Sequence, residues 1–254
     1  TEMIDNGYLL NRQLHLNYYA VKGLEARLLM WMQRYDEARA AARVILKSGA
    51  FPWANPSLMM VGNDFAMATE HVFALNNINM SAMDDNFFNA ETQISSFTIA
   101  PERLNSYFEP TDYRYLYQFV TSVTGEWLCC RKYSMPKNSD IYYSNKIPLV
   151  KLGEMQLIEA ECNYRLDGSG LEALNTLREM RGLLPLTAEP ADFMQELSAE
   201  YRREFIAEGQ LFFFYKRLNR TNISGTDKDM VAEKAYTFPL PKGETEAAER
   251  EQNR

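Results

Sequence analysis

Residues 20–38 read AVKGLEARLLMWMQRYDEA, and this stretch predicts two α-helices separated by a short turn. In its first half, mostly small or apolar residues recur with the period of one helix face. That stripe consists of Ala20, Gly23, Leu24, Arg27, Leu28 and Trp31. From Tyr35 onward, small and apolar residues keep helical spacing until Gly49 and Pro52 end the run. Because small side chains let helices approach closely, we expect an antiparallel helix pair.

The stripe also predicts which face of the first helix is buried. The expected contacts join Leu24, Leu28 and Trp31 of the first helix to Ala38, Ala42 and Ile45 of the second. One such pair cannot bury both of its faces by itself, so later helices should cover the remaining face. Ala26 followed by YDEA at 35–38 also matches part of the 34-residue tetratricopeptide pattern, and a single unit of this pattern is visible.

The rest of the chain divides into an aromatic, loop-rich stretch and a second helical region. Residues 51–145 scatter Gly, Pro, Asn, Asp and Ser among aromatic residues, with strand-like runs at 71–75 and 127–133. Helical spacing then returns, and the apolar run LFFFY at 211–215 is expected to be buried on several sides. We predict one continuous domain over 1–254, with a tetratricopeptide-like helix pair (11–48), a loop-rich aromatic insert (51–145) and C-terminal helices (146–241).

Composition excludes several classes of protein. The 254 residues are 46% apolar with a formal net charge of −7, which fits a globular chain and disfavours nucleic acid as a partner. Three cysteines and two histidines are too few for a disulfide framework, a zinc site or a Ser-His-Asp triad, so we expect no metal and no cofactor. No apolar run of about 18 residues predicts a membrane span, and the start at Thr1 shows no signal-peptide pattern.

Carboxylates recur on the later predicted helices, at Glu154, Glu161 and Glu204 among others. Paired carboxylates hydrolyse glycosides when one of them has a raised pKa. Arginines are about as numerous on the neighbouring helices, so we expect these glutamates to pair across helices with residues such as Arg178 and Arg203. This interpretation makes the carboxylates structural and the protein non-enzymatic.

The surplus of aromatic residues in the insert favours a sugar-binding surface. Aromatic rings stack on the C–H face of a sugar, and nearby Asn and Asp side chains can bond its hydroxyl groups. The candidate ligand-binding residues are Trp127, Tyr142, Tyr143, Phe87 and Asn86. Trp127 lies beside the turn predicted at Gly125 and Glu126, which favours exposure of its ring. Burial in the core stays an equal alternative, because Cys129 would share its strand face.

Several ordered motifs resemble the SusD/RagB family, the surface glycan-binding lipoproteins of Bacteroidetes. After the helix pair come EHVFAL at 70–75, PLVKLGE at 148–154, EAE at 159–161, ALN at 173–175, LR at 177–178, RGL at 181–183, Glu200 with RREF at 202–205, EG at 208–209 and FPLP at 238–241. The resemblance covers what would be the C-terminal part of a member. The departures are Lys151 and Tyr201 in place of arginines, and Leu211 and Phe214 in place of an Arg and an Asp. They put an ion-pair network of the family in doubt but leave the fold.

The resemblance implies a mainly α fold, a SusD-like α-α superhelix with short strands in the insert. It also implies capture of an oligosaccharide or other nutrient and its transfer to a TonB-dependent transporter of the SusC type. The location would be the outer membrane surface, through a lipid anchor absent from this chain. Glycan contacts vary between members, so no site residue follows from it. A tetratricopeptide-like scaffold that binds protein and no sugar is the alternative, and a helical glycoside hydrolase is a distant third.

Overall fold

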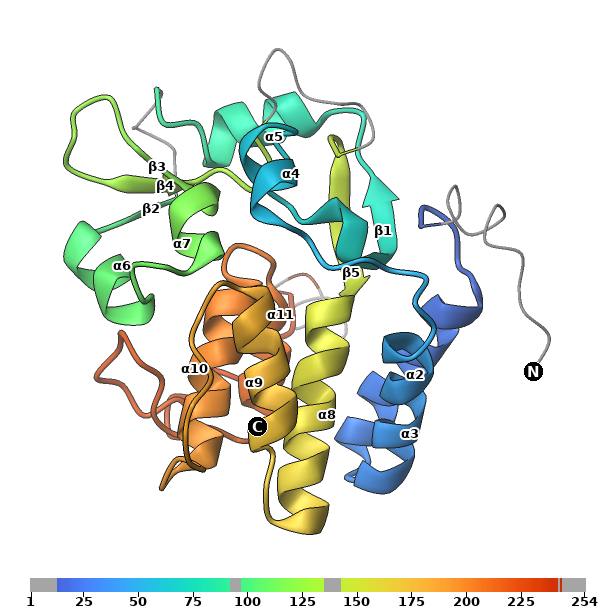
Figure 1. The fold of residues 1–254 in the computed structure, drawn as a ribbon. Coiled ribbons are helices and arrows are strands. Elements are labelled where there is room, and N and C mark those ends of the chain that lie inside the picture. Colours follow the sequence, from blue (N-terminus) through green and yellow to red (C-terminus); the bar gives the residue numbers. More distant parts are fainter. Residues whose placement is uncertain (1–12, 92–96, 135–142, 242, 244–254) are drawn as a thin grey trace. The chain divides into compact units, whose positions relative to one another are not determined.

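The computed structural model describes residues 13–91, 97–134, 143–241 and 243 (Figure 1). The chain divides into two compact units, Thr1–Ala207 and Glu208–Arg254. That the two units form one continuous domain stays a prediction. Helices account for most of the regular structure and the strands are short, which confirms the predicted mainly α fold with strands in the insert.

The elements of the first unit follow one another as a helix pair, a mixed insert and a set of longer helices (Figure 1). In chain order they are α2 (Tyr18–Trp31), α3 (Tyr35–Leu46), α4 (Pro56–Met60), η1 (Ala68–Glu70), β1 (His71–Asn76), α5 (Met80–Phe87), β2 (Thr98–Ile99), α6 (Pro101–Tyr107), α7 (Tyr113–Gln118), β3 (Phe119–Thr121), β4 (Leu128–Cys130), β5 (Lys146–Lys151), α8 (Leu152–Asp167), α9 (Leu171–Met180) and α10 (Phe193–Phe205).

The predicted pair of helices is present, and α3 packs against both α2 and α8. The N-terminus of α2 is capped by Asn17, whose side chain accepts a hydrogen bond from the Ala20 N–H at 2.9 Å. The side of the pair formed by α3 is covered by α8, as expected for a unit that cannot bury both faces alone. Their shared core includes Ala26, Leu29, Met30, Ala38, Ala42, Ile45, Met155 and Ile158.

The predicted buried face of α2 is right for the small residues Ala20 and Gly23, which are buried, and wrong for the three large residues of the stripe. Leu24, Leu28 and Trp31 are exposed, Leu28 to 61%, whereas Leu29 and Met30 lie in the core. The reason is that α2 is apolar on nearly its whole circumference, so the 3.6-residue period fits two overlapping faces equally well. Packing selects the face with the small residues, because only there does α2 approach its neighbours closely: a Cβ on Gly23 would lie 2.5 Å from Val150 Cγ1.

The strands of the insert form two small sheets, the first of them together with β5. The first pairs β1 with β5 in antiparallel fashion, with Ala74 opposite Pro148, and β5 leads directly into α8. The second has the order β2-β4-β3, and β3 and β4 form a hairpin around Gly125. The predicted strand-like run at 71–75 is β1, and the run at 127–133 contains β4. A separate aromatic core lies beneath the second sheet, formed by Met80, Phe88, Leu104, Phe108, Phe119, Cys130 and Tyr133.

The second unit contains α11 (Gln210–Arg217) and an irregular segment after it. The LFFFY run lies in α11, but the prediction of burial on several sides is wrong for part of it. Phe214 and Tyr215 are buried, whereas Phe213 is 52% exposed. Within this unit the Phe212 ring contacts the rings of Tyr236 and Phe238, at centroid distances of 6.1 and 5.1 Å. The helix is therefore amphipathic rather than apolar all round.

Candidate functional site

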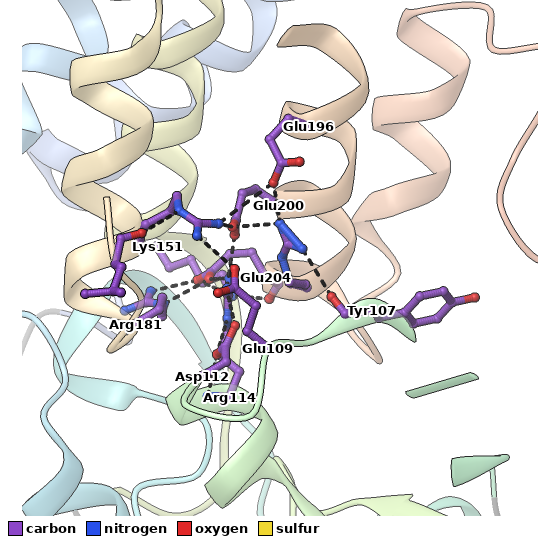
Figure 2. Close-up of polar contacts among 12 residues, drawn as sticks. Tyr107, Glu109, Asp112, Arg114, Lys151, Arg181, Glu196, Glu200 and Glu204 are labelled. Atoms are coloured by element: carbon purple, nitrogen blue, oxygen red, sulfur yellow. Dashed lines mark hydrogen bonds and ion pairs between the residues drawn. The ribbon is translucent and has the colours of Figure 1, made fainter. Parts of the chain in front are cut away.

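A buried network of charges joins the insert to the C-terminal helices (Figure 2). At its centre is Glu204 on α10, which is 1% exposed. Its carboxylate accepts hydrogen bonds from Arg181 at 2.9 and 3.1 Å and from Arg114 at 3.0 Å. The Lys151 ammonium lies 3.2 Å from the same carboxylate. One glutamate is thus surrounded by three cations from three different elements.

Each of these arginines also holds a carboxylate of the insert. Arg181 donates two hydrogen bonds of 2.7 Å to Glu70, on η1 just before β1. Arg114 on α7 binds Asp112 at 2.7 and 2.9 Å and reaches Glu200 on α10 at 3.0 Å. Such bidentate contacts fix the direction of a guanidinium as well as its distance. The network therefore sets the position of η1 and α7 against α10.

The electrostatics of the network keep its glutamates ionised. Burial alone would raise the pKa of Glu204, but the charges of Arg181, Lys151 and Arg114 outweigh it and hold that pKa well below the usual range. Burial likewise opposes ionisation of Glu200, and Arg114 and Arg203 lower its pKa below the usual value. A general acid of a glycosidase needs a raised pKa. The arrangement suits a structural role, as the sequence predicted.

The glutamates pair with arginines, as predicted, but mostly with arginines other than the predicted Arg178 and Arg203. Glu154 pairs with Arg27 of α2, at 2.5 and 2.6 Å, rather than with Arg178 or Arg203. Glu161 pairs with Arg165 one turn along the same helix, at 2.8 Å. Arg178 and Arg203 instead meet at Glu200, at 3.5 and 2.8 Å. Sequence spacing shows that cations are available on neighbouring helices, but helix rotation decides which of them comes within reach.

An exposed aromatic surface lies on the other side of the insert's core, where α5 ends. Phe87 and Phe97 stack with an interplanar angle of 14° and a centroid distance of 5.8 Å. The Phe97 N–H donates a 2.6 Å hydrogen bond to the Phe87 carbonyl, which holds the two backbones together. The rings are 43% and 66% exposed. We call this pair the Phe87–Phe97 platform.

The platform rests on a buried layer of rings. Phe88 is buried and contacts Phe87 and Phe97 at centroid distances of 6.5 and 6.0 Å. On its other side Phe88 contacts Tyr133 at 5.4 Å. The Phe88 N–H donates to the Asp84 carbonyl in the last turn of α5, so Phe88 is held at the end of that helix. The exposed rings are therefore supported from below, which gives a preformed surface.

Polar side chains lie close to Phe87 in the sequence, at the end of α5. Asn86 is exposed, and the Asn89 amide donates a 2.9 Å hydrogen bond to the exposed Asp85 carboxylate. Burial, together with the charge of Asp85, raises the pKa of Asp84 to about 6. Amide and carboxylate groups beside flat rings are the groups that bond sugar hydroxyls while the rings take the C–H face.

The structure brings together only part of the predicted site. Phe87 is one of the two platform rings, Asn86 precedes it in the sequence and is exposed, and Tyr142 lies outside the described residues. Trp127 is 42% exposed and lies just after the turn at Gly125. Its backbone N–H donates a hydrogen bond to Ser122 Oγ. Thr98 pairs with Cys129 and Ile99 with Leu128, so Phe97 and Trp127 lie at opposite ends of the β2–β4 ladder, about 10 Å apart.

Tyr143 belongs to a third place in the insert. It is half-buried and lines a cavity of about 10 Å³ together with Tyr133, Ser144 and Asn145, among others. That volume is enough for one water molecule and too small for a sugar ring. Phe97 was not among the predicted site residues. The signal that identifies it is an aromatic residue directly before the strand-like pair Thr98-Ile99 in a loop-rich stretch.

Among the described residues, no group of three or more His, Cys, Asp or Glu side chains is placed to hold a metal ion. Over the same part of the chain, no helix combines the length and apolar character needed to cross a membrane.

Comparison with known proteins places this geometry in a family. The model of the SusD family matches residues 69–253. No curated protein matches the chain. A SusD superfamily protein of Bacteroides thetaiotaomicron superposes with a TM-score of 0.71 at 16% identity, covering 94% of this chain and 58% of its own. Surface glycan-binding protein A of Bacteroides uniformis superposes with a TM-score of 0.66 at 19% sequence identity. The match covers 92% of this chain and 60% of that protein.

A third solved structure has the same fold as these two. A SusD-like carbohydrate binding protein of Bacteroides vulgatus gives a TM-score of 0.63 at 17% identity, covering 82% of this chain and 46% of its own. At these identities the likeness shows the fold, and the chain spans roughly half the length of the proteins it matches. The family model matches most of the chain and the fold agrees with it, so the chain belongs to the SusD family.

Proposed function

We propose that this chain binds an oligosaccharide at the Phe87–Phe97 platform. The observation that carries the proposal is a pair of stacked, exposed phenylalanine rings held by a backbone hydrogen bond and supported by buried Phe88. Two of the structural neighbours are described as a surface glycan-binding protein and a carbohydrate binding protein, which supports the same class of ligand.

The chemistry of the platform favours neutral sugars. Rings of phenylalanine have no hydrogen-bonding atom, so they contribute burial of sugar C–H groups and dispersion contacts. Asn86 and Asn89 flank Phe87 and Phe88 in the sequence and carry amide groups, and Asp84 and Asp85 of the same helix end are acidic. Shallow sites of this kind bind with dissociation constants on the order of micromolar to millimolar.

We also propose what happens to the glycan after it is bound. The captured glycan would pass to a TonB-dependent transporter of the SusC type in the outer membrane. The protein would be held at the cell surface by a lipid anchor outside this chain. In this proposal the protein is a binding protein and not an enzyme, which agrees with the ionised, arginine-paired state of Glu200 and Glu204.

The test is a calorimetric titration with a panel of neutral oligosaccharides. We expect the double variant Phe87→Ala/Phe97→Ala to lose at least tenfold in affinity. Phe213→Ala is the matched control, since it removes an equally exposed phenylalanine from the second unit. Trp127→Ala and Tyr143→Ala test the alternative platforms. If they weaken binding and the platform variant does not, the site lies elsewhere in the insert.

The same experiment separates the other functions. A protein scaffold would bind none of the oligosaccharides in the panel. A glycoside hydrolase would release reducing ends from them, which a reducing-sugar assay measures on the same samples.

A further inference from the structure

The C-terminal end of α5, where Phe87 of the platform lies, carries two acidic side chains. Asp84 and Asp85 fall in the last turn of this helix, and that turn has no basic residue. The carbonyl groups at a helix C-terminus already carry a partial negative charge, so a cation is favoured there and an anion is disfavoured. The two aspartates therefore oppose the stability of α5. Residues that break a local rule in this way are expected at functional sites.

The charge of Asp84 is not compensated by a cation. Its Oδ1 atom is buried and accepts no hydrogen bond. Among the described residues, the one charge that acts on Asp84 appreciably is that of Asp85, which has the same sign. Asp85 accepts a hydrogen bond from the Asn89 amide, a neutral group that leaves its charge in place. Asp84 therefore exerts its negative charge on whatever binds next to it.

Asp84 lies where the two segments that carry the platform rings approach each other. Residues three positions apart on a helix have Cβ atoms about 5 to 6 Å apart, so Asp84 and Phe87 are neighbours on α5. On the side of the second sheet, burial and the charge of Asp84 raise the pKa of the Cys129 thiol. Cys129 pairs with Thr98, the residue that follows Phe97. A sugar stacked on the platform would therefore lie within about 10 Å of this carboxylate.

The platform also differs from other aromatic rings of this protein in having no cation. The Arg131 guanidinium lies over the Phe65 ring at 4.0 Å, and that of Arg202 lies over Tyr107 at 4.2 Å. In the part of the chain that the structure describes, no lysine or arginine lies over Phe87 or Phe97 in this way. The platform thus combines a nearby negative charge with the absence of a positive group that would attract an acidic sugar.

We propose that Asp84 makes the Phe87–Phe97 platform select uncharged glycans over acidic ones, by repelling sugars that carry carboxylate or sulfate groups. This inference rests on the proposed function, because it concerns the ligand of the same platform. Two like charges about 7 Å apart, at an effective dielectric constant between about 20 and 80, weaken binding by about threefold to fiftyfold. Since Asp84 is partly buried, salt screens this repulsion less than it screens a surface pair.

The test compares charged and neutral forms of the same oligosaccharides. The probes are maltohexaose, cellohexaose and mannohexaose, each as the neutral sugar and after oxidation of its C6 hydroxyl groups to carboxylates. Calorimetry gives the ratio of the two dissociation constants for each backbone. We expect the oxidised form to bind wild type at least about threefold more weakly, and the ratio to fall towards one in Asp84→Asn. Glu172→Gln, which removes an exposed carboxylate from α9, is the control and should keep the wild-type ratio.

A pH series separates the charge of Asp84 from its shape. Because the pKa of Asp84 is raised to about 6, lowering the pH from about 7.5 to about 5 neutralises most of it, whereas sugar carboxylates stay ionised. The wild-type ratio should decrease towards one, and the Asp84→Asn ratio should stay constant. Cys129, which faces Asp84 from β4, stays neutral because its pKa is raised. Asp85 is the other titratable group beside Asp84, and Asp85→Asn measures its share.

The variant Phe87→Ala/Phe97→Ala distinguishes failure of this inference from failure of the proposed function. If this variant weakens binding of the neutral sugars, equal affinity of wild type for the oxidised forms overturns this inference alone. An Asp84→Asn ratio equal to that of wild type would also overturn it, because another group would then be the source of the discrimination. Neutral binding that survives the double variant, or no binding by any neutral probe, would overturn the proposed function and this inference with it.

Discussion

At the residue scale, Asp64 is a buried carboxyl group whose charge is only partly compensated. The side chain is fully buried, Oδ1 accepts a 2.7 Å hydrogen bond from the Ala68 N–H, and Oδ2 has no hydrogen-bond partner. Burial raises the pKa of Asp64 from 3.8 to about 6, and nearby Glu70 adds to this. The ionised form therefore disfavours the folded state at neutral pH.

The first prediction is that Asp64→Asn stabilises the protein at neutral pH. Because the folded pKa is the higher one, wild-type stability should rise as the pH falls from above 6 towards 4, in the window between the folded and unfolded pKa values. Asparagine keeps the acceptor for Ala68 without the charge, so the gain at pH 7.5 should approach about 3 kcal/mol at most. Urea denaturation between pH 5 and 8 measures it. An unchanged pH slope in the variant would contradict the assignment.

The second prediction grades three glutamates by the burial of their ion pairs. Glu204→Ala leaves Arg114, Lys151 and Arg181 buried with less compensation and should cost about 3 to 5 kcal/mol. Glu37→Ala removes an exposed pair with Arg34 and should leave the melting temperature nearly unchanged, because solvent screens the pair.

Glu154→Ala should fall between these two, since Glu154 is 8% and Arg27 25% exposed at the side chain. Thermal melts of the three variants give the order. A normal melt for Glu204→Ala would show that the buried network does not support the fold.

At the element scale, the contact between α2 and β5 decides which face of α2 is buried. Glycine normally weakens a helix, and replacing it with alanine in an exposed helix stabilises by about 1 kcal/mol. At Gly23 the added methyl group would lie 2.5 Å from Val150 Cγ1 and 3.5 Å from Ile45 Cδ1.

The third prediction is therefore that Gly23→Ala destabilises the protein, by about 1 to 3 kcal/mol, against the trend of helix propensity. Glu25→Ala, two positions along on the outer face, is the control and should change stability by less than about 1 kcal/mol. Chemical denaturation of both variants measures the difference. A stabilised Gly23→Ala variant would mean that α2 and β5 do not approach as closely as described.

At the scale of the whole molecule, the net charge of −7 should have little effect on the affinity of the proposed platform for a sugar. The platform rings carry no charge, and a neutral oligosaccharide brings none. The fourth prediction is that affinity changes less than about twofold between roughly 50 and 500 mM NaCl, because screening acts only on charges. Calorimetry at the two salt concentrations checks it. A tenfold loss of affinity at high salt would instead indicate an ionic site.

Much of the fold was predictable from the order of local patterns along the chain. The helix pair around YDEA at 35–38, the strand at 71–75 and the later helices each depend on spacing between near neighbours, which the sequence displays directly. The ordered motifs pointed to the family that the comparison confirms. Phe87, one of the two platform rings, was also among the sequence candidates, because an aromatic surplus in the insert is a property of composition; that these residues bind a ligand stays a prediction.

The sequence by itself therefore determined the class of fold and the family. Only the tertiary structure decided that Leu29 rather than Leu28 is buried, that Glu154 meets Arg27, and that Phe97 stacks on Phe87. Periodicity tells how residues are arranged around one helix, but the rotation of that helix follows from contacts with chain more than a hundred residues away. The Gly23–Val150 approach and the Arg27–Glu154 pair are non-local contacts of this kind, and close packing selects them only once all the elements are assembled. The rings of Phe87 and Phe97 are only ten residues apart, but they meet because the chain folds back after α5, which no periodic pattern in the sequence displays.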